Sequence, residues 1–142
     1  MYDVSYICNL RKNAMSRYLV FSNSSEYTRV MAQNIVYIVS AGNYSDIYTC
    51  DNKKYTVLAQ LGCIEKMITH QLDKKDQFLM RIGKCLIVNL LYVCYINPNR
   101  AHIILSDNRT FLFDNMNVES IKVSQEALKV LKEHFDNQKN NK

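Results

Sequence analysis

The sequence predicts a mainly β fold of the α+β class, with one short central helix and one helix at the C-terminus. Its 142 residues include 10 tyrosines but only 3 glycines and 1 proline, a composition that favours strands with few sharp breaks. Short apolar runs recur between turn-forming residues, as is typical of antiparallel strands. Clear helical periodicity is confined to two stretches. The length indicates one domain with short extensions.

The predicted strands begin after an N-terminal extension, residues 1–16. Tyr18–Phe21 and Tyr27–Met31 flank a turn of asparagine and serine residues and predict a hairpin. The β-branched and aromatic run Ile35–Val39 predicts a strand buried on both faces. We expect the folded domain to span residues 17–135.

A second hairpin and the central helix follow. Tyr44–Cys50 alternates between two faces, and Tyr55–Ala59 returns as its partner strand after a polar turn. The stretch Gln60–Leu72 predicts a helix, because four apolar residues recur on one stripe: Leu61, Ile64, Ile68 and Leu72.

The stretch Phe78–Asn89 combines a basic tip with an apolar stem. Arg81 and Lys84 surround Gly83, and the apolar segment Leu86–Val88 follows. Charge presented in this way can be read by phosphates, and neighbouring polar groups can be read by base edges. The alternative interpretation is an ordinary strand entered through a solvated turn.

Three short strands and a second helix complete the order. The strands are expected at Tyr92–Ile96, His102–Leu105 and Thr110–Phe113, with polar turns between them. Ser124 has the position of a helix N-cap, and apolar spacing predicts a helix to about Phe135.

The last segment, residues 136–142, has no apolar side chain and is expected to be a disordered tail.

Composition places limits on partners and location. The net charge of +5 permits an anionic partner without requiring one. The longest apolar run, Cys85–Ile96, is too short to cross a bilayer, which takes about 20 residues, so no membrane partner is expected. No signal peptide is found, and the five cysteines form no CxxC pair. We therefore expect a cytoplasmic protein with reduced, mostly buried thiols, and a redox role for one cysteine remains an alternative.

Motifs for catalysis or cofactor binding are not found. The three histidines lie far apart and none has a second histidine or cysteine at metal-ligand spacing. Phosphate-binding glycine loops and nucleophile motifs do not occur. Cys85 lies beside Lys84, but no histidine is placed to activate this thiol as a nucleophile. We therefore expect no enzyme, no cofactor and no metal.

Four segments together resemble the LytTR family of bacterial DNA-binding domains. Ile35–Ser45 is similar to the start of the family pattern, and the helix with Leu61 and Ile64 is similar to its central helix. Met80–Leu90 is close to the most specific family signature, which ends in valine and asparagine as here. Ile121–Leu131 is similar to the end of the pattern. The resemblance covers roughly residues 17–135, in the family's order and spacing.

The resemblance implies an elongated fold of antiparallel β-sheets stacked side by side. It also implies double-stranded DNA as the partner, in the form of promoter direct repeats, with loops entering successive major grooves and a homodimer on DNA as one arrangement. Three places would then contact bases, and the candidate residues at and beside them are Asn43, Tyr44, Ser45, Asp46, Arg81, Lys84, Gln125, Glu126 and Lys129.

Departures from the family pattern leave a second function open. Gly83 and Cys85 replace a usual histidine and serine, and Glu126 stands where many members carry an arginine. A carboxylate can accept from the amino group of cytosine, but it repels phosphates. Because Asp46 adds further negative charge, the alternative is a LytTR-like fold adapted to protein–protein interaction, with weak or no DNA binding.

Overall fold

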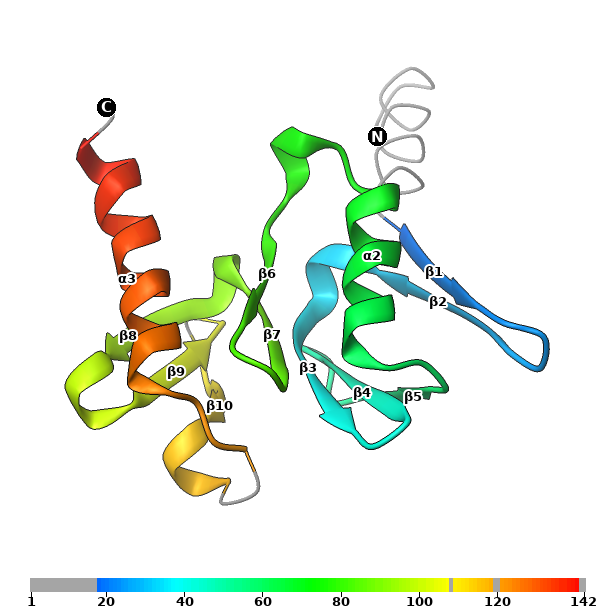
Figure 1. Ribbon diagram of the computed structural model, residues 1–142, viewed down its shortest axis with the longest axis horizontal. Helices are drawn as coiled ribbons and strands as arrows, with labels where there is room; N and C mark the ends of the chain where they lie inside the picture. Colours follow the sequence, from blue (N-terminus) through cyan, green and yellow to red (C-terminus); the bar gives the residue numbers. More distant parts are fainter. Residues whose placement is uncertain (1–17, 108, 119–120, 141–142) are drawn as a thin grey trace, which may run out of the picture.

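Antiparallel pairing builds three sheets that lie side by side along the long axis of the molecule (Figure 1). The computed structural model describes residues 18–107, 109–118 and 121–140. Its elements in chain order are β1 (Tyr18–Ser22), β2 (Tyr27–Met31), β3 (Ile35–Ala41), β4 (Tyr44–Thr49), β5 (Lys54–Val57), α2 (Leu61–Gln71), β6 (Leu79–Ile82), β7 (Leu86–Asn89), β8 (Val93–Asn97), β9 (His102–Ser106), β10 (Phe111–Asp114) and α3 (Gln125–Asn140).

The central sheet has five strands in the order β5-β4-β3-β7-β6. In its middle, Ile38 of β3 pairs with Ile47 of β4 on one side and with Ile87 of β7 on the other. All four residues of β7 are buried, because both faces of this sheet are covered. This explains why the segment reads as a continuous apolar run.

One face of the central sheet is covered by α2 and by the two-stranded β1–β2 sheet. The predicted stripe of α2 is buried against Ile38, Ile47 and Ile87, in one core cluster. Gln71 joins the two covering elements, since its Oε1 accepts from Val20 N and its Nε2 donates to Val20 O, both at 2.8 Å. The hairpin of β1 and β2 is thereby fixed to the end of the helix.

The other face is covered by the three-stranded sheet β10-β9-β8 and by α3. Leu86 and Val88 point into this second core, together with Leu128 and Leu131 of α3. An aromatic group joins the two sheets, as Tyr37 stacks on Tyr48 with ring centroids 4.6 Å apart and lies 4.4 Å from the Phe113 ring. The central sheet is therefore held between two cores.

The structure confirms the predicted fold class, the hairpin turns and the two helices. The N-cap is also confirmed, since Ser124 Oγ accepts from Ala127 N at 3.1 Å. The predicted end of the last helix at Phe135 is wrong, because α3 continues to Asn140. Polar contacts one turn apart sustain it beyond the apolar stripe: Lys132 with Asp136 at 2.7 Å and His134 with Gln138 at 3.2 Å.

Two further expectations concern the cysteines and the termini. The thiols are not mostly buried: Cys63 and Cys94 are exposed and Cys50 and Cys85 are half-buried, all four without a disulfide. Cys63 lies in α2, Cys94 lies in β8, and Cys50 and Cys85 lie in turns, and residue type alone does not distinguish these positions from core positions. The expected extension, residues 1–16, lies outside the described residues, as do residues 141–142 of the expected tail.

Candidate nucleic-acid interface

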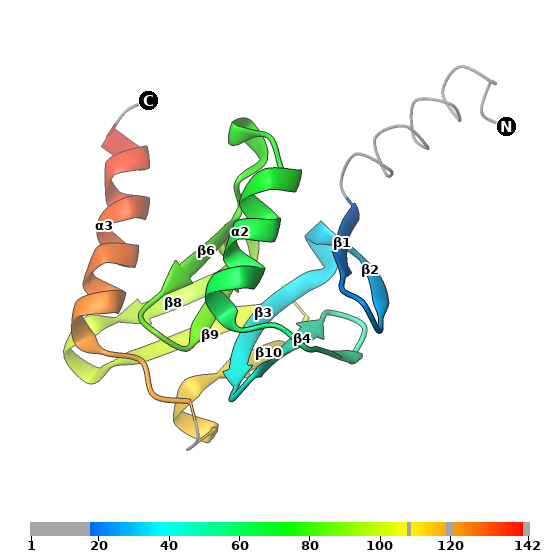
Figure 2. The same ribbon diagram turned by 45° about the vertical axis from the view of Figure 1, so that its right-hand side comes forward.

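Two hairpin turns lie at the same end of the central sheet. The pairing of β3 with β7 places Val39 opposite Leu86, and Ser40 N donates to Cys85 O at 3.0 Å. The β3–β4 turn at Gly42 and Asn43 therefore projects beside the β6–β7 tip, Gly83–Cys85. Both turns are at the lower end of the molecule in Figures 1 and 2, away from the C-terminus.

The start of α3 lies against the β6–β7 tip. A Cβ at Gly83 would stand 3.7 Å from Ala127 Cβ, and Cys85 Sγ donates to Lys122 O at 3.5 Å. These contacts bring residues 121–127 to the end of the sheet that carries both turns. The structure thus brings together the three regions at which the family resemblance places DNA contacts.

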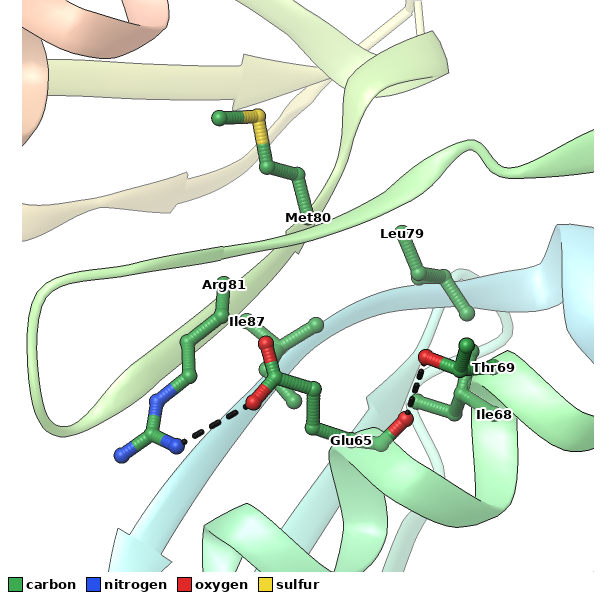
Figure 3. Close-up of a pocket in the computed structure, with 7 residues that line it drawn as sticks. All are labelled: Glu65, Ile68, Thr69, Leu79, Met80, Arg81 and Ile87. Atoms are coloured by element: carbon green, nitrogen blue, oxygen red, sulfur yellow. Dashed lines mark hydrogen bonds and ion pairs between the residues drawn. The ribbon is translucent and has the colours of Figure 1, made fainter. Parts of the chain in front are cut away.

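Arg81 holds the backbone of the β6–β7 tip and connects it to α2. Its Nη2 donates to Lys84 O at 3.0 Å, and its Nη1 lies 3.3 Å from Glu65 Oε1 of α2. Figure 3 shows the two charged groups facing each other at a cavity of about 200 Å³ between α2 and the β6–β7 hairpin. The side chain of Arg81 is only 29% exposed. Arg81 is therefore placed to hold the tip rather than to meet DNA as a free cation.

Lys84 stands on this support with its side chain exposed. Within the described part of the chain it forms no ion pair, so its charge is available to an external anion. Gly83 has a φ of +69°, in the left-handed region that favours glycine, which accounts for glycine at the point where the tip turns. The tip presents one unneutralised cation on a backbone fixed from two sides.

The β3–β4 hairpin presents fewer side chains than expected. Asn43 and Tyr44 are exposed, whereas Ser45 is fully buried and donates its hydroxyl to Ala59 O at 2.7 Å. The expectation that Ser45 contacts DNA is corrected on this ground, because a buried, bonded hydroxyl cannot reach a base. Its strand position, on the buried face with Ile47 and Thr49, requires this orientation.

Asp46 lies further along β4, on the opposite face from Ser45. It is half-buried and accepts from Thr56 Oγ1 at 2.7 Å. Burial raises the pKa of Tyr37 to about 12, and the charges of Tyr48 and Asp46 add to this increase. Asp46 therefore faces the aromatic group between the sheets more than the turn itself.

The predicted residues of α3 occupy different situations. Gln125 is tied to a neighbouring turn, since its Nε2 donates to Asn99 O at 3.0 Å. Glu126 is exposed in the first turn of the helix and forms no ion pair within the described residues. Lys129 is exposed one turn further along α3. A carboxylate thus stands beside the basic tip.

Two cations at this end of the molecule were not among the sequence candidates. Lys122 is exposed between the buried residues Ile121 and Val123, an alternation that the sequence displays and that predicts its outward direction. Arg100 is exposed in the turn Pro98–Arg100, which Gln125 contacts through Asn99. No local signal identifies Arg100, because its position depends on the packing of β8 and β9 against α3.

No group of three or more histidine, cysteine or acidic residues that could hold a metal ion occurs within the described residues. In the same part of the chain, no helix has the length and apolar character needed to cross a membrane.

Comparison with known proteins agrees with the geometry. The family model of the LytTr DNA-binding domain matches residues 25–136. Among solved structures, the LytTr DNA-binding domain of a protein from Bacillus cereus described as a methyl-accepting/DNA response regulator matches with a TM-score of 0.50 at 15% identity, covering 82% of this chain and 94% of that chain. At this identity the likeness shows the fold alone. No curated protein matches the chain in sequence.

Proposed function

Because the chain belongs to the LytTR family of DNA-binding domains, we propose that it is a sequence-specific regulator of transcription that sets loops into the major groove of double-stranded DNA. The family is one of DNA-binding domains and not of enzymes. The cytoplasm, where a bacterial chromosome lies, is the location that this function implies.

The observation that carries the proposal is the convergence of two turns and a helix start around Lys84. Two hydrogen bonds support it, from Arg81 Nη2 to Lys84 O and from Cys85 Sγ to Lys122 O, and a Cβ at Gly83 would stand 3.7 Å from Ala127 Cβ. A tip whose backbone is fixed before binding loses little conformational freedom when it docks, and this favours affinity. An exposed and unpaired cation at such a tip suits a polyanion.

Some exposed side chains at this end can contact base edges, and others can contact the DNA backbone. Lysine can donate to guanine O6 and N7 or to a phosphate, and the amide of Asn43 can pair with the N6 and N7 edge of adenine. The major groove is about 12 Å wide and admits elements of secondary structure, so a hairpin tip is narrow enough to enter. Two copies on direct repeats would place such tips in successive grooves.

The experiment that tests the proposal is removal of the cation in Lys84→Ala. We expect DNA affinity to fall about tenfold and the slope of log K against log salt to decrease in magnitude by about 1, because one ionic contact is lost. Fluorescence anisotropy on promoter fragments at several salt concentrations measures both. Thermal unfolding should be unchanged, since an exposed side chain contributes little to packing.

Lys75→Ala is the matched control. It removes the same charge from the exposed loop Lys74–Asp76, which joins α2 to β6 at the opposite end of the molecule (Figure 1). If both variants bind DNA as the wild type does, Lys84 does not face the duplex. If the wild type binds no genomic fragment even at low salt, the proposed function is wrong.

The exposed position of Glu126 supports a second candidate function. Its unpaired carboxylate repels phosphates, and it stands at the start of α3, beside the basic tip. A surface with both signs of charge could instead bind a protein partner. Absence of DNA binding together with a cross-linked partner at this end would favour that function.

A further inference from the structure

We propose that a shallow hollow near the β6–β7 tip and the start of α3, bordered by Arg100 and Lys122, binds one sugar–phosphate unit of the DNA backbone. The hollow has a volume of about 320 Å³ and lies between the turn Pro98–Arg100, the turn Asn115–Asn117 and residues 121–123. This inference rests on the proposed function and extends it, since Arg100 lies outside the regions at which the family resemblance places DNA contacts and Lys122 is not among the candidate residues of those regions.

The two cations at the hollow have no acidic partner among the described residues. Arg100 and Lys122 are both exposed, and neither forms an ion pair within the described residues. None of the described residues that line the hollow is acidic. The nearby carboxylate of Asp114 is engaged by His102 Nε2 at 2.8 Å. Two cations that share one hollow without an acid can be neutralised by an external phosphate.

The backbone that carries Arg100 is held in place from three elements. Asn97 Oδ1 accepts from Arg100 N at 3.2 Å, Gln125 Nε2 donates to Asn99 O at 3.0 Å, and Asn115 Nδ2 donates to Ala101 O at 2.7 Å. Such a set of side-chain contacts fixes the direction in which the turn presents its cation.

Ala101, the residue after Arg100, adds a sign of strain. Its φ of 50° and ψ of 46° lie in the left-handed region, which is unfavourable for a residue with a Cβ. Strained backbone of this kind persists where the surrounding structure imposes it, and it is concentrated at binding sites. The strain and the three tethers point to a turn whose geometry is maintained for contact.

The remaining lining of the hollow suits a sugar. Met116 is 48% exposed and Val118 is half-buried, so the lining offers apolar surface in addition to the two cations. A deoxyribose ring has an apolar carbon face next to its charged phosphate. The hollow therefore offers complementary surface to both parts of one backbone unit and reads no base.

The contact of Cys85 Sγ with Lys122 O connects the hollow to the β6–β7 tip. A duplex that receives Lys84 in its groove would therefore meet Lys122 and then Arg100 with its flanking backbone. The contact should add affinity and salt dependence for every DNA sequence, because it involves phosphate alone.

The test compares two double variants of the same charge change. Arg100→Ala with Lys122→Ala removes both cations at the hollow, and Lys74→Ala with Lys75→Ala removes two exposed lysines at the far end. We expect the first pair to lower DNA affinity about tenfold, to reduce the salt slope by about 1 and to leave the order of preferred sequences unchanged. The second pair should change none of these.

A DNA duplex with single neutral methylphosphonate linkages gives a second readout. A methylphosphonate at one position beside the recognised bases should weaken DNA binding by the wild type. It should not weaken binding by the Arg100→Ala, Lys122→Ala variant, which lacks the cations that contact this phosphate. Suppose the wild type prefers particular sequences, but the methylphosphonate linkage and the loss of Arg100 and Lys122 have no effect on its binding. Only the proposal that the hollow binds the DNA backbone would then be wrong. If the wild type binds all sequences equally and the double variant still has a smaller salt slope, only the proposed function is wrong. If the wild type binds no DNA, both proposals are wrong.

Discussion

The two hairpin tips at the proposed DNA-binding end are built alike but supported differently. Gly42 and Gly83 both have a φ of +69°, and each allows its chain to turn. A Cβ at Gly42 would meet nothing within 4 Å, whereas one at Gly83 would contact Ala127. The β6–β7 tip is further held by Arg81, while the β3–β4 turn projects freely.

The difference suggests a division of roles between the tips. A cation gains most from a fixed backbone, because a tip that is already ordered avoids an entropic loss on binding. An amide such as Asn43 must align with one base edge, and a free turn allows it to adjust. We therefore expect the fixed tip to contribute mainly affinity and the free tip mainly sequence preference.

The largest effect on stability is expected from Ile87→Ala, which removes a buried side chain from β7, the strand that joins the two hairpins. Ile87 is 1% exposed and pairs with Ile38 of the β3–β4 hairpin. Removing its side chain should lower the free energy of unfolding by roughly 2–5 kcal/mol. Urea unfolding measures this loss, and DNA binding should return under conditions in which the variant is folded.

Leu91→Ala serves as the control for Ile87→Ala, since Leu91 is 67% exposed and its loss should change stability by less than about 0.5 kcal/mol. Equal losses in the two variants would show that β7 is not the buried support of the tips.

The next largest effect is expected from alanine at the two glycines. Each substitution places a Cβ in the left-handed region, so each should cost about 1–2 kcal/mol of stability. DNA affinity should separate them: a backbone shift at Gly83 would disturb the neighbouring hydrogen bond from Arg81 to Lys84 O and bring the new Cβ against Ala127, while the turn at Gly42 can relax into open space. Anisotropy and thermal unfolding on both variants measure the two quantities. A greater affinity loss for Gly42→Ala would reverse the comparison.

A smaller effect is expected from removing the support of the fixed tip without changing the net charge. The double variant Glu65→Gln, Arg81→Met deletes one charge of each sign and keeps the stem that lines the cavity (Figure 3). We expect affinity to fall severalfold with an unchanged salt slope, because Arg81 positions Lys84 and does not meet a phosphate.

The control for this variant is whether its loss of DNA affinity adds to the loss caused by Lys84→Ala. Lys84→Ala should cost less affinity on the Glu65→Gln, Arg81→Met background than on the wild type, since the tip is already loosened. Full additivity, or a slope reduced by about 1, would identify Arg81 as a direct contact.

The sequence was sufficient for the elements and for the tip, because both depend on local patterns. Alternation along β4 predicts that Ser45 shares a face with Ile47 and Thr49, and the spacing of Leu61, Ile64 and Ile68 predicts α2. The basic tip with its apolar stem also follows from neighbouring residues. These signals need no knowledge of distant partners.

The roles of individual site residues could not be predicted, because they depend on partners far away in the chain. Arg81 is held by Glu65, 16 residues away, and Ser45 by Ala59, 14 residues away. Arg100 owes its position to packing against α3. Residue type alone predicts Arg81 as a DNA contact, whereas its hydrogen bond to Lys84 O and its ion pair with Glu65 favour a supporting role.

The smallest effect is expected from Glu126→Gln, which tests whether the charge beside the fixed tip limits its contribution to affinity. Removing an exposed carboxylate should raise affinity about twofold to tenfold for all sequences at low salt, and the gain should shrink above 0.1 M, where the Debye length is about 10 Å. Helix stability should fall by no more than about 1 kcal/mol, as the acid favours the N-terminus of α3. Anisotropy across salt concentrations measures the gain, and Glu133→Gln, an exposed acid further along α3, is the matched control. A loss of affinity confined to sites with one particular cytosine would instead mean that Glu126 reads its amino group, and the fixed tip would then share in sequence preference.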